Sequence, residues 1–166
     1  MFKKPRSQWT QSNDSLKRCL PFALINNILP IISETSLTNP HPIKVSCNLL
    51  YITAVRWLWF GTPKEDIIPS LLNIPQNTNF YWNSTVMDVL KQVQRNEIRN
   101  VTGNTKRWVL NSFYCAFYAL VNSTSFKDGI DQIIQMGGDT GTNGAISGGM
   151  LGAYYGYTKM RQDNSK

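Results

Sequence analysis

The sequence has few acidic residues: 10 Asp and Glu stand against 17 Lys and Arg among its 166 residues, which gives a formal net charge of +7. Such a charge suits a nucleic acid or another phosphate-bearing partner. The basic residues are scattered in pairs, however, and no aromatic-basic motif for RNA accompanies them. The charge therefore predicts a solvated basic surface, and a basic nucleic-acid-binding helical protein stays open as an alternative.

Cysteine is scarce as well. Cys19, Cys47 and Cys115 are odd in number and far apart, and none belongs to a Cys-x-x-Cys motif of the kind that redox and zinc sites use. We interpret them as reduced thiols in the core of an intracellular protein. The basic start of the chain also lacks the apolar run of a signal peptide, so we expect a soluble, cytoplasmic protein.

Long apolar runs are missing too. The two longest, residues 20–32 and 145–157, fall short of the roughly 20 residues that a helix needs to span a bilayer. We therefore expect no membrane partner.

The sequence shows no sustained alternation of apolar and polar residues, which is the pattern of a half-buried strand. Helical spacing of apolar residues is frequent instead, and the sequence predicts an all-α fold, a helical bundle. The predicted helices cover residues 16–32 with a kink or end at Pro30, residues 43–60, a stretch that starts at Pro63, a stretch that starts near residue 84, residues 109–120, and a stretch from Ser125 to Gly137.

Glycine is concentrated in the last predicted helix. Gly144, Gly148, Gly152 and Gly156 fall four residues apart, and each costs up to about 1 kcal/mol relative to alanine inside a helix. The close approach of another helix would compensate for this cost. We therefore expect this glycine stripe to be buried.

The loop before this helix carries hard oxygen ligands. Asp139 supplies a carboxylate, and Thr140 and Thr142 supply hydroxyls, at a predicted helix N-terminus. Oxygen atoms of this kind suit Mg²⁺, which keeps several of its waters when a protein binds it. A simple helix cap by Asp139 or a threonine accounts for the same residues, so the residues by themselves leave both interpretations open.

Residues 137–156 are similar to the closing motif of the ADP-ribosylglycohydrolase family, which reads Gly-Gly-Asp-Thr-Asp-Thr-Asn/Ile-Ala-Ala-Ile-Ala-Gly-Ala-x-x-Gly-Ala-Tyr-Tyr-Gly. Residues 12–24 resemble its Gly-Asn-Gly-Ser-Leu-Met-Arg loop and helix, and residues 36–42 resemble its Ser-x-Leu-Thr-His-Pro-x-Pro segment. The resemblance implies the C-terminal part of the family fold over residues 9–157, with a flexible arm at 1–8 and a tail at 158–166.

Members of this family bind two Mg²⁺ ions between the closing loop and an Asp-Asp-Thr cluster near the N-terminus. They hydrolyse the bond that joins ADP-ribose to a protein side chain or a small group. The resemblance implies that the metal ligands are Asp139 and Thr142, with Thr140 as a further candidate. It implies that the substrate-binding residues are Asn13, Ser15 and Asn39, and that the partner is ADP-ribose or an ADP-ribosylated protein.

The sequence departs from the family pattern at three positions. Gly141 stands where the family has the second aspartate of the metal loop, Asp14 replaces a glycine of the substrate loop, and Asn39 replaces a histidine. The N-terminal region with its acid cluster has no counterpart. We therefore expect a single, weakly bound Mg²⁺ ion. His41 is a candidate general base, although no carboxylate partner can be assigned to it and the catalytic residues stay unassigned.

Three functions are open on this resemblance. The chain is a weak hydrolase, or a module that binds ADP-ribose or a related nucleotide without cleaving it, or a half-enzyme. The half-enzyme would be completed by a second polypeptide or a second copy of the chain, since half of a helical bundle exposes apolar surface that is usually covered.

Overall fold

The computed structural model describes residues 11–38, 41–78 and 81–163. These residues form eight α-helices, two 3₁₀ helices and no strand, which confirms the predicted all-α fold. In chain order the helices are α1 (Asp14–Arg18), η2 (Leu20–Leu24), α2 (Leu29–Thr38), α3 (Pro42–Trp59), α4 (Lys64–Leu72), α5 (Ser84–Gln94), η3 (Gly103–Thr105), α6 (Val109–Asn122), α7 (Phe126–Met136) and α8 (Thr140–Asp163).

The single helix predicted over residues 16–32 is wrong. Helix α1 ends at Arg18, η2 follows as a separate turn, and α2 begins at Leu29. Pro30 therefore lies in the first turn of α2 and does not end a helix. A proline is tolerated there because the N–H that it lacks would have no partner within the helix.

The other predicted helix ends lie within two residues of the observed ends where the structure describes them. Asn83 and Ser125 cap α5 and α7, since their side chains accept from the backbone N–H of Val86 and Asp128. After α3, Gly61 adopts a φ of 95°, a left-handed conformation that glycine reaches without steric cost. These local signals placed the helix ends correctly because they do not depend on distant contacts.

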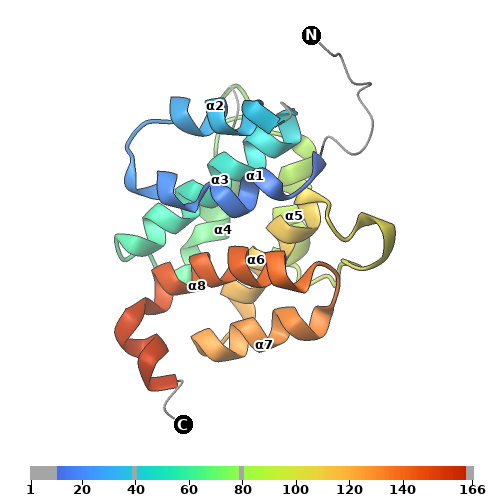
Figure 1. Ribbon diagram of the computed structural model, residues 1–166. Coiled ribbons are helices and arrows are strands. Elements are labelled where there is room, and N and C mark those ends of the chain that lie inside the picture. The colour runs from blue at the N-terminus through green and yellow to red at the C-terminus, as the bar shows by residue number, and fades with distance from the viewer. Residues whose placement is uncertain (1–10, 39–40, 79–80, 164–166) are drawn as a thin grey trace.

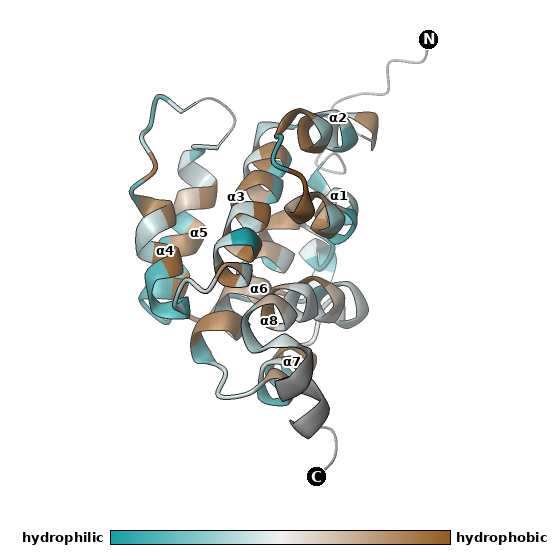
Figure 2. Ribbon diagram, turned by 90° about the vertical axis from the view of Figure 1, so that its left-hand side faces the viewer, coloured by the Kyte–Doolittle hydropathy of each residue, from teal (hydrophilic) through white to brown (hydrophobic). Residues whose placement is uncertain are grey.

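Helix α3 lies in the middle of the bundle, with α4 and α5 on one side and α1 and α2 on the other (Figure 2). Helix α8 packs against α3, α6 and α7, and α7 and α8 lie side by side in the lower half of the molecule (Figure 1). The last helix therefore contacts elements from the beginning, the middle and the end of the chain.

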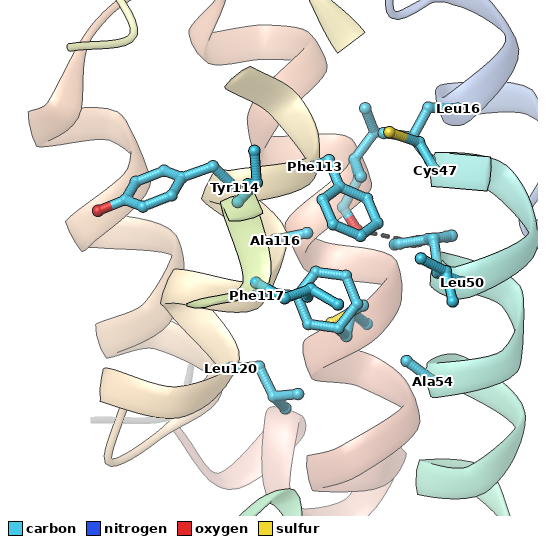
Figure 3. Close-up of a cluster of buried hydrophobic side chains, with 14 of the residues drawn as sticks. Leu16, Cys47, Leu50, Ala54, Phe113, Tyr114, Ala116, Phe117 and Leu120 are labelled. Atoms are coloured by element: carbon cyan, nitrogen blue, oxygen red, sulfur yellow. Dashed lines mark hydrogen bonds between the residues drawn. The ribbon is translucent and has the colours of Figure 1, made fainter. Parts of the chain in front are cut away.

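The core forms where α3, α6 and α8 meet. Phe113 and Phe117 of α6 point toward Cys47 and Leu50 of α3 (Figure 3), and the centroids of the two phenylalanine rings are 4.6 Å apart. Eleven residues of α6 are buried. Because nearly every face of α6 is covered, the polar groups on it must find hydrogen bonds inside the protein.

All three predicted core thiols are buried and none is bridged. Burial raises the pKa of Cys115 to about 12. A thiol in this environment stays protonated at neutral pH, and it is the thiolate that reacts.

The prediction of a buried glycine stripe is wrong in part, because Gly144, Gly148, Gly152 and Gly156 are only half-buried. A Cβ atom added at Gly148 would lie 3.6 Å from Cδ1 of Ile130, an ordinary contact. The position that requires glycine is Gly149, which is outside the stripe. A Cβ there would lie 2.7 Å from the Tyr51 hydroxyl and 2.8 Å from Leu20.

We predict opposite effects for alanine at these neighbouring positions. Gly149→Ala should destabilise the protein by about 1–3 kcal/mol, because the added methyl group overpacks the contact with Tyr51 and Leu20. Gly148→Ala should stabilise it by up to about 1 kcal/mol through helix propensity. Urea unfolding of both variants and the parent measures the difference. Equal midpoints for the two variants would contradict this packing.

Lys44 is a polar residue in the apolar part of α3. Its side chain is 0% exposed, and Nζ has no hydrogen-bond partner among the described residues. Burial lowers the pKa of the Lys44 ammonium, and the positive charge of Arg18 adds to this effect, whereas Asp14 and Glu34 oppose it. The charged form is therefore disfavoured in the folded chain.

We predict that Lys44→Met stabilises the protein at neutral pH by about 1–3 kcal/mol, the mutational cost of a buried polar group without a hydrogen bond. The gain should shrink as the pH rises above the lowered pKa of Lys44 toward the ordinary pKa of a lysine. In that range the unfolded parent chain keeps a proton that the folded chain releases, so the parent gains stability with pH. Urea unfolding across this pH range tests it, and a gain that is constant with pH would contradict it.

Candidate functional site

Asn13 reaches from the start of α1 to two other parts of the fold. Its Nδ2 atom donates one hydrogen bond to Oδ2 of Asp139 at 3.1 Å and another to Oγ of Ser112 at 2.9 Å. Asp139 immediately precedes α8, and Ser112 lies in α6. The structure thus brings together Asn13 and Asp139, for which the resemblance implied substrate binding and metal binding.

Ser112 and Asn143 fix the direction of this network. The Ser112 hydroxyl donates to Oδ1 of Asn143 at 2.6 Å, so its oxygen is left to accept from Asn13. The backbone N–H of Asn143 donates in turn to the Asp139 carbonyl oxygen at 2.8 Å. Because a serine hydroxyl has one hydrogen to give, the Asn13 amide keeps its N–H groups toward Asp139 and its oxygen away from it.

Sequence reasoning missed Ser112 and Asn143. Both side chains are 0% exposed, and both are polar residues within helices that are rich in apolar or small residues. A polar residue predicted on the buried face of a helix needs a hydrogen-bond partner, and this signal was present in the sequence. The sequence signal could not show which hydrogen-bond partner Ser112 or Asn143 would have.

The backbone before Asp139 requires its two glycines. Gly137 and Gly138 have φ values of 77° and 76°, and a Cβ atom at Gly138 would collide with the carbonyl oxygen of Val101. Loop 101–107 therefore packs directly against the Gly137–Asp139 turn. This contact sets the place from which Asp139 extends.

Asp139 does not act as a helix cap among the described residues. A capping carboxylate accepts from a backbone N–H in the first turn of its helix, whereas the hydrogen bond to the Asp139 side chain comes from Asn13. Thr140 and Thr142 are half-buried at the start of α8, and Gly141 between them is exposed. No atom lies within 4 Å of a Cβ added at Gly141, so the loop has room for the aspartate of the family motif.

The other predicted substrate residues differ in their placement. Ser15 is 0% exposed, and its hydroxyl has no partner among the described residues. Asn39 lies outside the residues that the structure describes.

His41 caps α3 by accepting at Nδ1 from the backbone N–H of Ile43 at 3.2 Å, and its Nε2 lies 3.2 Å from Nε2 of Gln11. No carboxylate among its described contacts orients this ring as a general base.

Asp139 brings one carboxylate to the start of α8, where Thr140 and Thr142 follow it in sequence. The described residues contain no group of three or more His, Cys, Asp or Glu side chains that could hold a metal. Oxygen ligands are the kind that Mg²⁺ accepts, and this ion takes one or two protein carboxylates and keeps several waters. Two ions that share ligands require more carboxylate oxygen than this part of the chain offers.

The sequence matches a known family. A family model described as ADP-ribosylglycohydrolase matches residues 2–165, so the chain belongs to the ADP-ribosylglycohydrolase family. Comparison with curated proteins and with solved structures gives no match. The family match confirms the resemblance stated on the Gly137–Gly156 motif and the helical fold that it implied.

Within the described residues, no helix has the length and apolar character needed to cross a membrane.

We predict that Asn13→Asp weakens the folded state more than Asn13→Ala at neutral pH. The alanine variant should lose about 1–3 kcal/mol, the range for lost buried hydrogen bonds. The aspartate variant also places two carboxyl groups against each other, and they can stay in contact only if they share a proton. The folded variant then binds that proton more tightly than the unfolded chain, so its stability should rise as the pH falls.

Urea unfolding of both variants at about pH 7 and about pH 4.5 checks this prediction. The alanine variant is the control, since it removes the amide without adding a charge. Equal losses for the two variants at both pH values would show that Asn13 does not lie against Asp139.

Proposed function

We propose that this chain binds an ADP-ribosyl group at Asn13 and Asp139 and hydrolyses the glycosidic bond between ADP-ribose and a protein side chain or small acceptor. The observation that carries the proposal is the hydrogen bond of 3.1 Å between Asn13 and Asp139. It joins the two segments to which the resemblance assigns substrate and metal. Membership of the ADP-ribosylglycohydrolase family supports the same reaction class.

The cation that we propose for this site is a single Mg²⁺, held by the Asp139 carboxylate with Thr142 and Thr140 as further oxygen donors. When bound, such an ion polarises an oxygen atom and favours the build-up of negative charge on it. The Asn13 amide supports this role, because its hydrogen bond to Oδ2 of Asp139 orients the carboxylate.

The chain's own residues supply orientation at this site. Ser112 and Asn143 hold the Asn13 amide in one direction, so its carbonyl oxygen faces away from Asp139. Preorganised groups of this kind spend no energy on reorientation when a ligand binds. The buried network therefore supports ligand binding even where hydrolysis is slow.

A second candidate function is binding of ADP-ribose or a related nucleotide without cleavage. Two observations favour it: Gly141 contributes no carboxylate, and the described residues hold no group of three metal-ligating side chains. Carboxylates from a second polypeptide or a second copy of the chain would restore hydrolysis. The basic nucleic-acid-binding alternative rests on net charge alone.

We predict that the chain releases ADP-ribose from modified arginine or serine slowly, and that Asp139→Ala abolishes this release and the heat of Mg²⁺ binding. Gly141→Asp should fold as well as the parent, because its Cβ meets open space, and should bind Mg²⁺ more tightly through a second carboxylate. Calorimetry with Mg²⁺ and a hydrolysis assay on the three proteins test both expectations.

The outcomes separate the candidates. Binding of ADP-ribose by the parent without any release would support the second candidate. Mg²⁺-dependent release that survives Asp139→Ala would show that other residues hold the metal, and a parent that neither binds nor cleaves ADP-ribose would refute both candidates.

A further inference from the structure

Loop 101–107 contacts the candidate site at both of its ends. At one end the carbonyl oxygen of Val101 packs against Gly138, next to Asp139. At the other end the carbonyl oxygen of Arg107 accepts from the backbone N–H of Asn13 at 3.0 Å. In Figure 1 this loop is the yellow segment on the right of the molecule, before α6. A ligand bound at Asn13 and Asp139 would therefore lie beside this loop.

The loop is exposed and carries no negative charge. Residues 102–107 are all exposed, and no Asp or Glu occurs anywhere in residues 98–127. Two consecutive cations, Lys106 and Arg107, stand at the end of the loop that is bonded to Asn13. The two acidic residues of the site already have partners, since Asn13 donates to Asp139 and Lys17 pairs with Asp14.

These two cations differ from the other exposed cations of the described residues. Elsewhere the exposed cations pair with carboxylates: Lys17 with Asp14, Arg18 with Glu34, Lys91 with Asp88, Arg95 with Glu97 and Lys127 with Asp131. Three half-buried cations donate to carbonyl or amide oxygens, namely Arg56, Lys64 and Arg99. The side chains of Lys106 and Arg107 have no such partner in the described part of the chain, so both are available to an external anion.

We propose that Lys106 and Arg107 bind the phosphate groups of the ADP-ribosyl ligand. This inference rests on the proposed function and extends it, because it assigns the anionic part of the ligand to a particular loop. A guanidinium binds two phosphate oxygens at once, and a neighbouring ammonium adds a mobile point charge. The backbone bond between Arg107 and Asn13 keeps the pair at the edge of the site.

A diphosphate fits this loop better than a strand of RNA does. Proteins that bind single strands combine a basic groove with aromatic rings on which successive bases stack. The aromatic residue next to this loop is Trp108, and the Arg99 guanidinium lies 5.5 Å from the centroid of its ring. The loop itself contains no aromatic residue. Two adjacent cations without a stacking ring beside them suit a compact anion such as a diphosphate.

Calorimetric titration with ADP-ribose tests this inference. The test protein is the double variant Lys106→Gln with Arg107→Gln. Its control is Lys91→Gln with Lys127→Gln, which removes the same charge from α5 and α7. We expect the test variant to bind ADP-ribose at least about tenfold more weakly than the parent and with less dependence on salt. The control variant should bind like the parent.

Several outcomes would overturn the inference. If the parent binds ADP-ribose and the test variant binds it equally well, the loop does not hold the phosphates, although the proposed function stands. If the parent does not bind ADP-ribose at all, the proposed function fails as well. Inorganic phosphate that binds the parent as tightly as ADP-ribose would indicate a general anion site. Oligouridine binding that is lost in the test variant, with ADP-ribose binding retained, would indicate a nucleic-acid surface.

Discussion

Burial of α6 is the constraint on which the rest of the site depends. Because the helix is covered on nearly every face, the hydroxyl of Ser112 has no access to water and must bond to protein groups. It finds one partner in α8 and another at the start of α1. The requirement to satisfy one buried hydroxyl thus draws together two loops that are far apart in the sequence, and these loops form the candidate site.

Most of the fold could be predicted from the sequence, because most helix ends depend on local chemistry. Asn83, Ser125 and Gly61 act within a few residues of themselves, and the helices beside them begin or end within one residue of the predicted positions. The prediction failed over residues 16–32, where apolar spacing continues through three short elements. Because the residues around Pro30 are apolar, this proline could stand either at the end of one helix or in the first turn of the next. The packing of α2 against α3 decides between these two positions.

The site was less predictable, for a related physical reason. The family motif pointed to Asp139 and Asn13, but the residues that hold them, Ser112 and Asn143, depend on how three helices pack. The glycine stripe shows the same limit. Spacing along a helix says which glycines share a face, whereas the need for glycine at position 149 arises from the side chains of Tyr51 and Leu20.

Loop 101–107 is held at both ends and also at Thr105, whose carbonyl oxygen accepts from the Asn111 side chain of α6 at 2.9 Å. Val101 is held against Gly138 and Arg107 is bonded to Asn13, while Gly103 between them adopts a φ of 73° in an exposed turn. Exposed turns of small and polar residues tolerate inserted sequence. A longer segment between Gly103 and Asn104 would leave both anchors in place. It would change the surface beside Asp139 without changing the buried residues that hold Asn13 in its orientation.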